Sequence, residues 1–260
     1  MEVHAHTHTA RKKWTHYLFE FLMLFLAVFC GFLAEYQLEH KIEKDREMQY
    51  MQSMLKDLQN DTTAINKALA GNEALLDGLD TLMDIIAKPG NDKAYGKRLF
   101  LYSVKYTYWF FNVEFSQLTL SQLKNSGGYR LIKNKEAAAA VVGYSEGLEW
   151  SKGQFAELVQ YFHKYEDTQK EIFNWSAAKG CYVWLDNDKM NMLRPMQEME
   201  KLVIGENYIL SGANLQLSRY YSELLFYTSA MKNLNTNFRN QKKKAITFIK
   251  LIKENYKLKN

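Results

Sequence analysis

A stretch of fourteen residues without a charge, Phe21 to Ala34 (FLMLFLAVFCGFLA), constrains this chain more than any other feature. Trp14 and Tyr36 flank it, as aromatic side chains do at the two interfaces of a membrane. A helix from Trp14 to Tyr36 is about 30 Å long, enough to cross the hydrocarbon core of a bilayer. The sequence therefore predicts one transmembrane helix over residues 14–36, with the lipid bilayer as a partner.

Two other interpretations of this stretch fit less well. It could be the buried core helix of a soluble protein, but little else in the chain could cover so apolar a segment. It could be a cleaved signal peptide, but a cut after Ala34 would place Phe32 at the position where peptidases need a small residue. A lipoprotein site at Cys30 has the same problem, because Phe29 precedes it. We therefore expect an anchor that stays in the membrane.

The charges beside the span indicate its orientation. The segment before the span is purely positive, with Arg11, Lys12 and Lys13. The segment after it also has three basic residues, but five carboxylates make it net acidic. These carboxylates are Glu35, Glu39, Glu43, Asp45 and Glu47. Because positive flanks tend to stay inside, we predict a cytoplasmic N-terminus and, in a Gram-negative host, an inner-membrane protein with its bulk in the periplasm.

One face of the predicted span carries small and polar residues. Glu20, Ala27, Gly31 and Ala34 are spaced 7, 4 and 3 residues apart and so share this face. Small side chains allow a second helix to approach closely, and a carboxylate prefers protein to lipid. We predict that these four residues form a transmembrane packing face, for self-association or for another membrane protein.

Long helices are also predicted for the rest of the chain, which has only two prolines in 260 residues. From Met48 to Ile86 apolar positions recur at alternating intervals of three and four residues, which places them in one line, or seam, along a helix. Pro89-Gly90 then stops the pattern. We expect this helix to be continuous with the span through residues 37–47. A second seam of similar length runs from Ala213 to Ile252. The first seam comprises Met48, Met51, Leu55, Leu58, Thr62, Ile65, Leu69, Asn72, Leu76, Leu79, Met83 and Ile86; the second comprises Ala213, Leu217, Tyr220, Leu224, Tyr227, Met231, Leu234, Phe238, Gln241, Ala245, Phe248 and Ile252.

Between the two seams, residues 93–125 and 134–174 read as two more helices, the first with a break near residues 115–121. Ser126-Gly127-Gly128 separates them as a helix cap and turn. Residues 175–211 read as a long connection with a short helix around 189–202. The predicted fold is all-α, a transmembrane helix continuing into an antiparallel, four-helix-like bundle. The predicted organisation is a His-rich, basic cytoplasmic tail (1–13), the span (14–36), a charged juxtamembrane helix (37–47) and the bundle (48–260).

Two segments resemble a known family. They are FEFLMLFLAVFCGFLAEYQLEHKIEKDREMQYMQSMLKDLQNDT at 19–62 and LKNSGGYRLIKNKEAAAAVV at 123–142. Together they are similar to a Bacteroidota family of membrane-anchored helical proteins of unknown function. The resemblance implies a Gram-negative cell envelope, and it implies no catalytic residues.

The C-terminal part of the chain is strongly basic, with nine Lys or Arg from Met231 onward and one acid, Glu254. Such a tail can meet nucleic acid, anionic lipid or an acidic protein, and a solvated helix face is the plain alternative. In an antiparallel bundle the last helix returns toward the membrane. We therefore predict a basic patch at the membrane surface and no nucleic-acid partner. The patch consists of Lys242, Lys243, Lys244, Lys250, Lys253 and Lys257.

The sequence offers weak candidates for chemistry. His4, His6 and His8 could chelate a metal, but a His-rich tail without a ligand is the simpler interpretation. Asp186-Asn187-Asp188 lacks the glycine and distal Glu of a calcium loop. His40 and His163 have no ligand partner three or four residues on. No cofactor and no metal are therefore predicted.

An aromatic stripe between Phe100 and Phe115 could line a ligand pocket, although a filled core is the stronger interpretation. The stripe consists of Phe100, Tyr102, Tyr106, Tyr108, Trp109, Phe110, Phe111 and Phe115. We predict a non-enzymatic, membrane-tethered scaffold or accessory subunit of the cell envelope. The alternative is an extracytoplasmic sensor or ligand-binding bundle that signals through a partner. An enzyme is a third hypothesis.

Overall fold

The structure is a computed structural model that describes residues 13–90, 92–184, 195–203 and 205–257. The described part of the chain is all-helical and contains no strand. Six α-helices and two 3₁₀ helices follow one another in it. They are α1 (Trp14–Ala87), α2 (Lys93–Tyr106), α3 (Leu118–Asn125), η1 (Gly128–Leu131), α4 (Lys135–Ile172), η2 (Trp175–Trp184), α5 (Met196–Glu200) and α6 (Asn214–Tyr256).

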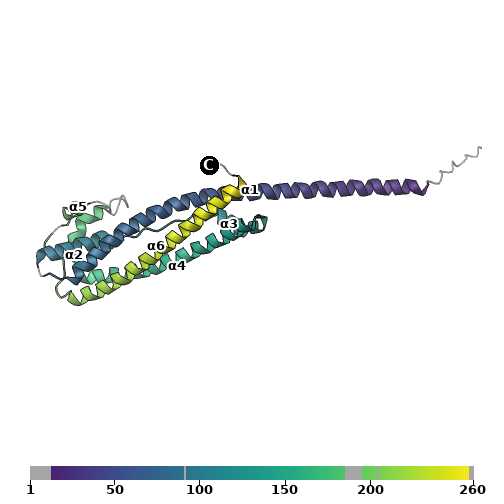
Figure 1. The fold of residues 1–260 in the computed structure, drawn as a ribbon. Helices are drawn as coiled ribbons and strands as arrows, with labels where there is room; N and C mark the ends of the chain where they lie inside the picture. Colours follow the sequence, from purple (N-terminus) through teal and green to yellow (C-terminus); the bar gives the residue numbers. More distant parts are fainter. Residues whose placement is uncertain (1–12, 91, 185–194, 204, 258–260) are drawn as a thin grey trace, which may run out of the picture.

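Helix α1 has 74 residues and projects far beyond the other elements, as Figure 1 shows. Residues 14–46, which we call the exposed half of α1, are solvent-accessible along their whole length, and only Glu43 among them is half-buried. Of the described helices, α1 alone contains a stretch long and apolar enough to cross a membrane, and none of that stretch is buried in the structure. The predicted continuity of the apolar segment with the first seam is confirmed.

Residues 47–87, the packed half of α1, form one side of the core. Ten of the twelve predicted seam positions from Met48 to Ile86 are buried, and Met48 and Thr62 are half-buried. Lys88 ends the helix just before Pro89, because proline restricts the residue before it and cannot continue the hydrogen-bond ladder. The 3.5-residue pattern thus identified the buried face of this helix correctly.

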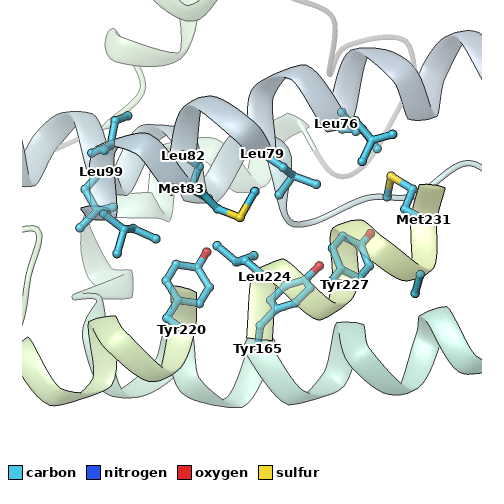
Figure 2. Packing of buried hydrophobic residues seen from close by; sticks show 14 of the residues in the cluster. Leu76, Leu79, Leu82, Met83, Leu99, Tyr165, Tyr220, Leu224, Tyr227 and Met231 are labelled. Carbon is cyan, nitrogen blue, oxygen red and sulfur yellow. The ribbon is translucent and has the colours of Figure 1, made fainter. Parts of the chain in front are cut away.

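Helices α4 and α6 complete the main packing of the molecule (Figure 1). The predicted helix 134–174 is confirmed as α4, and all twelve predicted seam residues of the last helix are buried, eleven of them in α6 and Ala213 directly before it. Lys232 of α6 pairs with Asp80 of α1, and Tyr256 reaches back to Glu47, so α6 runs antiparallel to α1. Figure 2 shows the centre of the core, where α1 leucines face tyrosines of α4 and α6.

The second predicted helix, 93–125, differs from the structure. Helix α2 ends at Tyr106, and α3 begins only at Leu118, so the break is longer and earlier than the expected one at 115–121. We call the non-helical segment Thr107–Gln117 the strap. The predicted turn at Ser126-Gly127-Gly128 is confirmed: α3 ends at Asn125, and Gly127 has a positive φ of 66° that suits glycine.

The connection after α4 contains η2 and α5. Helix α5 (Met196–Glu200) falls within the short helix expected around 189–202, of which residues 189–194 lie outside the described part. Asn174 N donates to Tyr208 O, and Leu210 N donates to Ile172 O, so the connection returns to the end of α4 before α6 begins.

Candidate functional site

The predicted transmembrane packing face lies entirely in the exposed half of α1. Glu20, Ala27, Gly31 and Ala34 are all exposed, and the carboxylate of Glu20 lies 3.1 Å from Nε2 of His16. A Cβ added at Gly31 would meet no atom within 4 Å. This face is therefore available to a second helix, and its role in packing remains a prediction.

The predicted basic patch is spread along the last part of α6. Lys243, Lys244, Lys250 and Lys257 are exposed, whereas Lys242 and Lys253 are half-buried. Nζ of Lys244 donates to the carbonyl of Gly143 at 3.0 Å. Lys250 lies 3.7 Å from Glu254. The patch thus has two parts, residues 242–244 and residues 250–257, about a dozen ångströms apart along the helix.

The strap is the least expected feature of the packed region. Phe111 bonds to Asn72, and Ser116 bonds to Asp61, so five strap residues cover the length of eleven residues of α1. That length is about 16 Å of helix, or about 3.3 Å per strap residue, which is the rise of a β-strand. The strap therefore runs fully extended and antiparallel to α1 between α2 and α3 (Figure 1).

An extended segment without a neighbouring strand needs side chains to satisfy its backbone groups. The amide of Asn72 does this as a pair: its Nδ2 donates to Phe111 O, and its Oδ1 accepts from Phe111 N, both at 2.9 Å. Nδ2 also donates to Oδ1 of Asn235 at 3.0 Å. A buried Asn at a seam position therefore ties α1, the strap and α6 together.

Tyrosines from α4 and α6 bond to the other end of the strap. Tyr165 donates its hydroxyl to Thr107 O, and Tyr227 donates to Trp109 O at 3.3 Å. Figure 2 shows these hydroxyls pointing from α4 and α6 toward α1. Burial raises the pKa of Tyr227 and of Tyr165 above the ordinary value, so both hydroxyls stay protonated as donors.

Asp61 is a buried carboxylate that joins three elements. It accepts from Ser116 N at 2.8 Å and from the hydroxyl of Tyr144 in α4 at 2.6 Å. Burial raises the pKa of Asp61, although these two hydrogen bonds act in the opposite direction. Burial and the Asp61 carboxylate together raise the pKa of Tyr144. The pair stabilises the position of the strap against both α1 and α4.

Two glycines of α1 make room for aromatic side chains. A Cβ at Gly71 would lie 2.4 Å from the ring of Phe111, and a Cβ at Gly78 would lie 2.1 Å from the ring of Tyr106. Both distances are far below van der Waals contact, so the rings pack directly on the helix backbone. The predicted filled-core role of the aromatic stripe is confirmed for these two rings, which pack against the main core cluster.

Glu47 marks the end of the packed region that is nearest the exposed half. Its Oε1 accepts from Tyr256 OH at 2.6 Å and from Lys133 N at 2.9 Å. The carboxylate therefore binds the end of α6 and the chain just before α4. Burial and Glu47 together raise the pKa of Tyr256. Sequence reasoning placed Glu47 only among the juxtamembrane acids and missed this role.

A shallow groove between α4 and α6 is rich in side-chain amides. Within it Gln241 Nε2 donates to Tyr144 O at 2.8 Å, and Ser151 Oγ donates to Asn237 Oδ1 at 3.2 Å. Trp150 stands exposed at the rim. The bond to Tyr144 O accounts for the Gln241 amide without a ligand, whereas Nδ2 of Asn237 is buried and has no hydrogen-bond partner among the described residues.

The structure adds no support for a metal site at the residues considered in the sequence analysis. His4, His6, His8 and Asp186-Asn187-Asp188 lie outside the described residues. Within the described ranges no group of three or more His, Cys, Asp or Glu side chains has the geometry to hold a metal ion. His163 pairs with Glu166 at 3.2 Å, and the ring of His40 lies against Tyr36.

The chain was compared with protein-family models, curated proteins and solved structures. No match was found in any of the three comparisons.

Proposed function

We propose that this chain is a non-enzymatic, membrane-tethered scaffold or accessory subunit whose packed part is an antiparallel, four-helix-like bundle. The supporting observation is that α1 runs unbroken from the apolar segment into the core. In the proposed setting, the inner membrane of a Gram-negative envelope, the N-terminus is cytoplasmic and the bundle is periplasmic.

An unbroken helix gives the bundle a defined place relative to the bilayer. A Gly- and Ser-rich linker would let a tethered domain move freely within its reach, whereas a helix holds it at about 1.5 Å per residue. The buried polar residues of α1 support the same interpretation, because Glu47, Asp61 and Asn72 all bind backbone groups of this chain. These contacts stabilise a shape, and a scaffold functions through its shape.

The test is affinity capture of the full chain from mild detergent, with identification of whatever co-purifies. In one variant, residues 38–44 are replaced by seven Gly and Ser residues, which keeps both anchor and bundle but uncouples them. In a matched control the same residues are replaced by seven helix-forming residues. A scaffold retains a stoichiometric membrane partner with the native chain and the helical control, and loses most of it with the flexible variant.

Two other results would contradict the proposal. If no protein co-purifies and a small molecule remains bound to the bundle, the sensor alternative is favoured. If the partner is retained equally by the flexible variant, the continuous helix has no role in positioning.

Orientation has a separate test. In a chain that also carries Cys181→Ser, the side chain introduced by Lys88→Cys at an exposed position should react with a membrane-impermeant label once the outer membrane is permeabilised. Labelling that appears only after the inner membrane is broken would place the bundle in the cytoplasm instead.

A further inference from the structure

Three segments that are distant in sequence meet at the end of the packed region nearest the exposed half of α1. Glu47 binds both Tyr256 at the end of α6 and Lys133 just before α4. Tyr129 of η1 and Tyr256 pack against the same core cluster as Met51 and Ile252. The end of α6, η1 and the start of α4 therefore lie beside α1 where it enters the packed region (Figure 1).

Six basic side chains lie at this end of the packed region, and we call this group of residues the basic collar. They come from two regions of the sequence, and only the α6 members belong to the predicted patch. The collar consists of Arg130, Lys133, Lys135, Lys250, Lys253 and Lys257. Five of these six are exposed, and Lys253 is half-buried. Glu136 and Glu254 are the acids within the same segments, so the collar carries a clear excess of positive charge.

Helix α1 determines how far the collar lies above the apolar segment. Glu47 follows Tyr36 by 11 residues, which is about 16 Å of α-helix. Headgroups occupy about 5–7 Å of that height if Tyr36 lies at the hydrocarbon boundary. The remaining gap is about 10 Å, close to one Debye length at physiological salt, and long lysine and arginine side chains shorten it.

The helix between collar and span does not cancel this charge. With Glu47 it carries five carboxylates against Lys41, Lys44 and Arg46, an excess of two acids, which is smaller than the excess of four basic residues in the collar segments. Glu43 already pairs with Lys133 at 3.2 Å.

We propose that the basic collar binds the anionic phospholipid headgroups of the leaflet that α1 leaves, and so fixes the height and tilt of the bundle on the membrane. This inference depends on the membrane anchoring in the proposed function and adds a second contact with the same bilayer. Basic side chains near a membrane are attracted to anionic lipids, and the attraction weakens over a Debye length.

The structure supplies a matched control within the same helix. Lys242, Lys243 and Lys244 precede Lys250, the nearest collar residue of α6, by 6 to 8 residues and precede Tyr256 by 12 to 14 residues. They therefore lie about 9–12 Å farther from the membrane than Lys250 and about 20 Å farther than the end of α6. The latter distance is about two Debye lengths, so their charges should be screened from the lipid. A variant that loses three collar charges and a variant that loses these three lysine charges have the same net charge. They differ in how far the changed residues lie from the membrane.

The experiment uses the full chain in liposomes, with Cys30→Ser and Cys181→Ser. A dye attached after Asn125→Cys, at an exposed position, serves as energy-transfer donor, and labelled lipid at the surface serves as acceptor. Liposomes of phosphatidylcholine are compared with liposomes containing about one third phosphatidylglycerol, at a lower salt concentration of about 0.1 M, where the Debye length is about 10 Å, and at a high concentration of about 1 M. The collar variant combines Arg130→Gln, Lys135→Gln and Lys257→Gln; the control combines Lys242→Gln, Lys243→Gln and Lys244→Gln.

We expect more energy transfer in the anionic liposomes at low salt, a return to the neutral value at high salt, and loss of most of the increase only in the collar variant. Equal transfer in both lipids, or equal losses in both triple variants, would overturn the proposal. A chain that fails to float with neutral liposomes would refute the anchoring itself, and with it the geometry that the collar needs. Helical circular dichroism of each variant checks that these surface changes leave the fold intact.

Discussion

The two halves of α1 have the same backbone conformation and opposite surroundings. In the exposed half, large apolar residues such as Phe21, Met23 and Leu24 occur around the whole circumference and face outward. In the packed half, residues such as Leu58 and Leu79 recur at three and four positions and are fully buried. An apolar surface on all sides suits lipid, whereas a stripe suits a protein core, and one helix contains both arrangements.

The polar residues differ in the same way. In the packed half, Asp61 and Asn72 are buried, and each binds a backbone group of the strap. In the exposed half, Glu20 is exposed beside His16, which lies one turn earlier in the same helix. Buried polar groups of the packed half therefore specify which segments of this chain lie beside them, whereas the exposed Glu20 remains accessible to a partner outside this chain.

The largest difference between the halves should appear when the same leucine substitution is made in each. Leu79→Ala, at a fully buried position, should lower the free energy of unfolding by about 2–5 kcal/mol. Leu24→Ala should leave the unfolding of the packed region unchanged, because this side chain is exposed and touches no core residue. Denaturant unfolding in mild detergent measures both. Equal losses in the two variants would show that the exposed half contributes to the core.

Glycine substitutions give the next largest effect, with opposite signs at two helical sites. Gly78→Ala should destabilise the chain by about 1–3 kcal/mol, because the new Cβ would collide with the Tyr106 ring. Gly143→Ala in α4 meets no atom within 4 Å and should stabilise by about 0.5–1 kcal/mol through helix propensity. Thermal unfolding of the two variants should therefore move in opposite directions; a shared gain would mean that no ring lies against Gly78.

Removal of the Asn72 amide tests the attachment of the strap. Asn72→Ala leaves the N–H and C=O of Phe111 without their partner and should cost about 1–2 kcal/mol. Hydrogen exchange at the Phe111 amide should also become faster. Gln52→Ala, at an exposed position of the same helix, is the control and should change neither measurement. Unchanged exchange in Asn72→Ala would contradict the strap geometry.

A smaller effect is expected in the pH dependence of stability. The raised pKa of Asp61 means that the folded chain holds a proton that the unfolded chain has already released. Stability from this group should therefore increase as the pH falls from neutral through the raised pKa, with no further gain below the ordinary value of 3.8. Asp61→Asn should remove this part of the pH dependence. Asp84→Asn, at an exposed position, should keep it, and parallel pH profiles for the two variants would refute the assignment.

The smallest effect on stability is expected at Gly31. Gly31→Leu should leave the unfolding of the packed region unchanged, since nothing lies within 4 Å of this position. It should nevertheless weaken helix association in the membrane, because a large side chain separates the two backbones. Crosslinking in liposomes measures this association. Undiminished crosslinking would remove the support for the predicted packing face.

Periodicity predicted the long helices well, because a seam such as Ala213 to Ile252 depends only on spacing, and all of its residues are buried. The stop at Pro89-Gly90 and the turn at Gly127 were also predictable from local chemistry. These features share one property: each is determined by residues close together in the sequence.

The strap was not predictable in the same way. Residues 107–117 include aromatic residues at helical spacing, and nothing local requires an extended chain. Its conformation depends on partners such as Asn72, Asp61 and Tyr227, which lie between 39 and 118 residues away in the sequence from the groups they bind. Gly71 and Gly78, seven residues apart on the buried face, were the one signal that a bulky neighbour packs there.

The unbroken course of α1 has a mechanical consequence. Each residue of an α-helix advances the chain by about 1.5 Å and turns it by about 100°. A single residue inserted between Tyr36 and Glu47 would therefore raise the bundle only slightly but turn a different side of it toward any neighbour fixed in the membrane. In the proposed membrane setting, the length of this segment determines which surface of the packed region faces a partner.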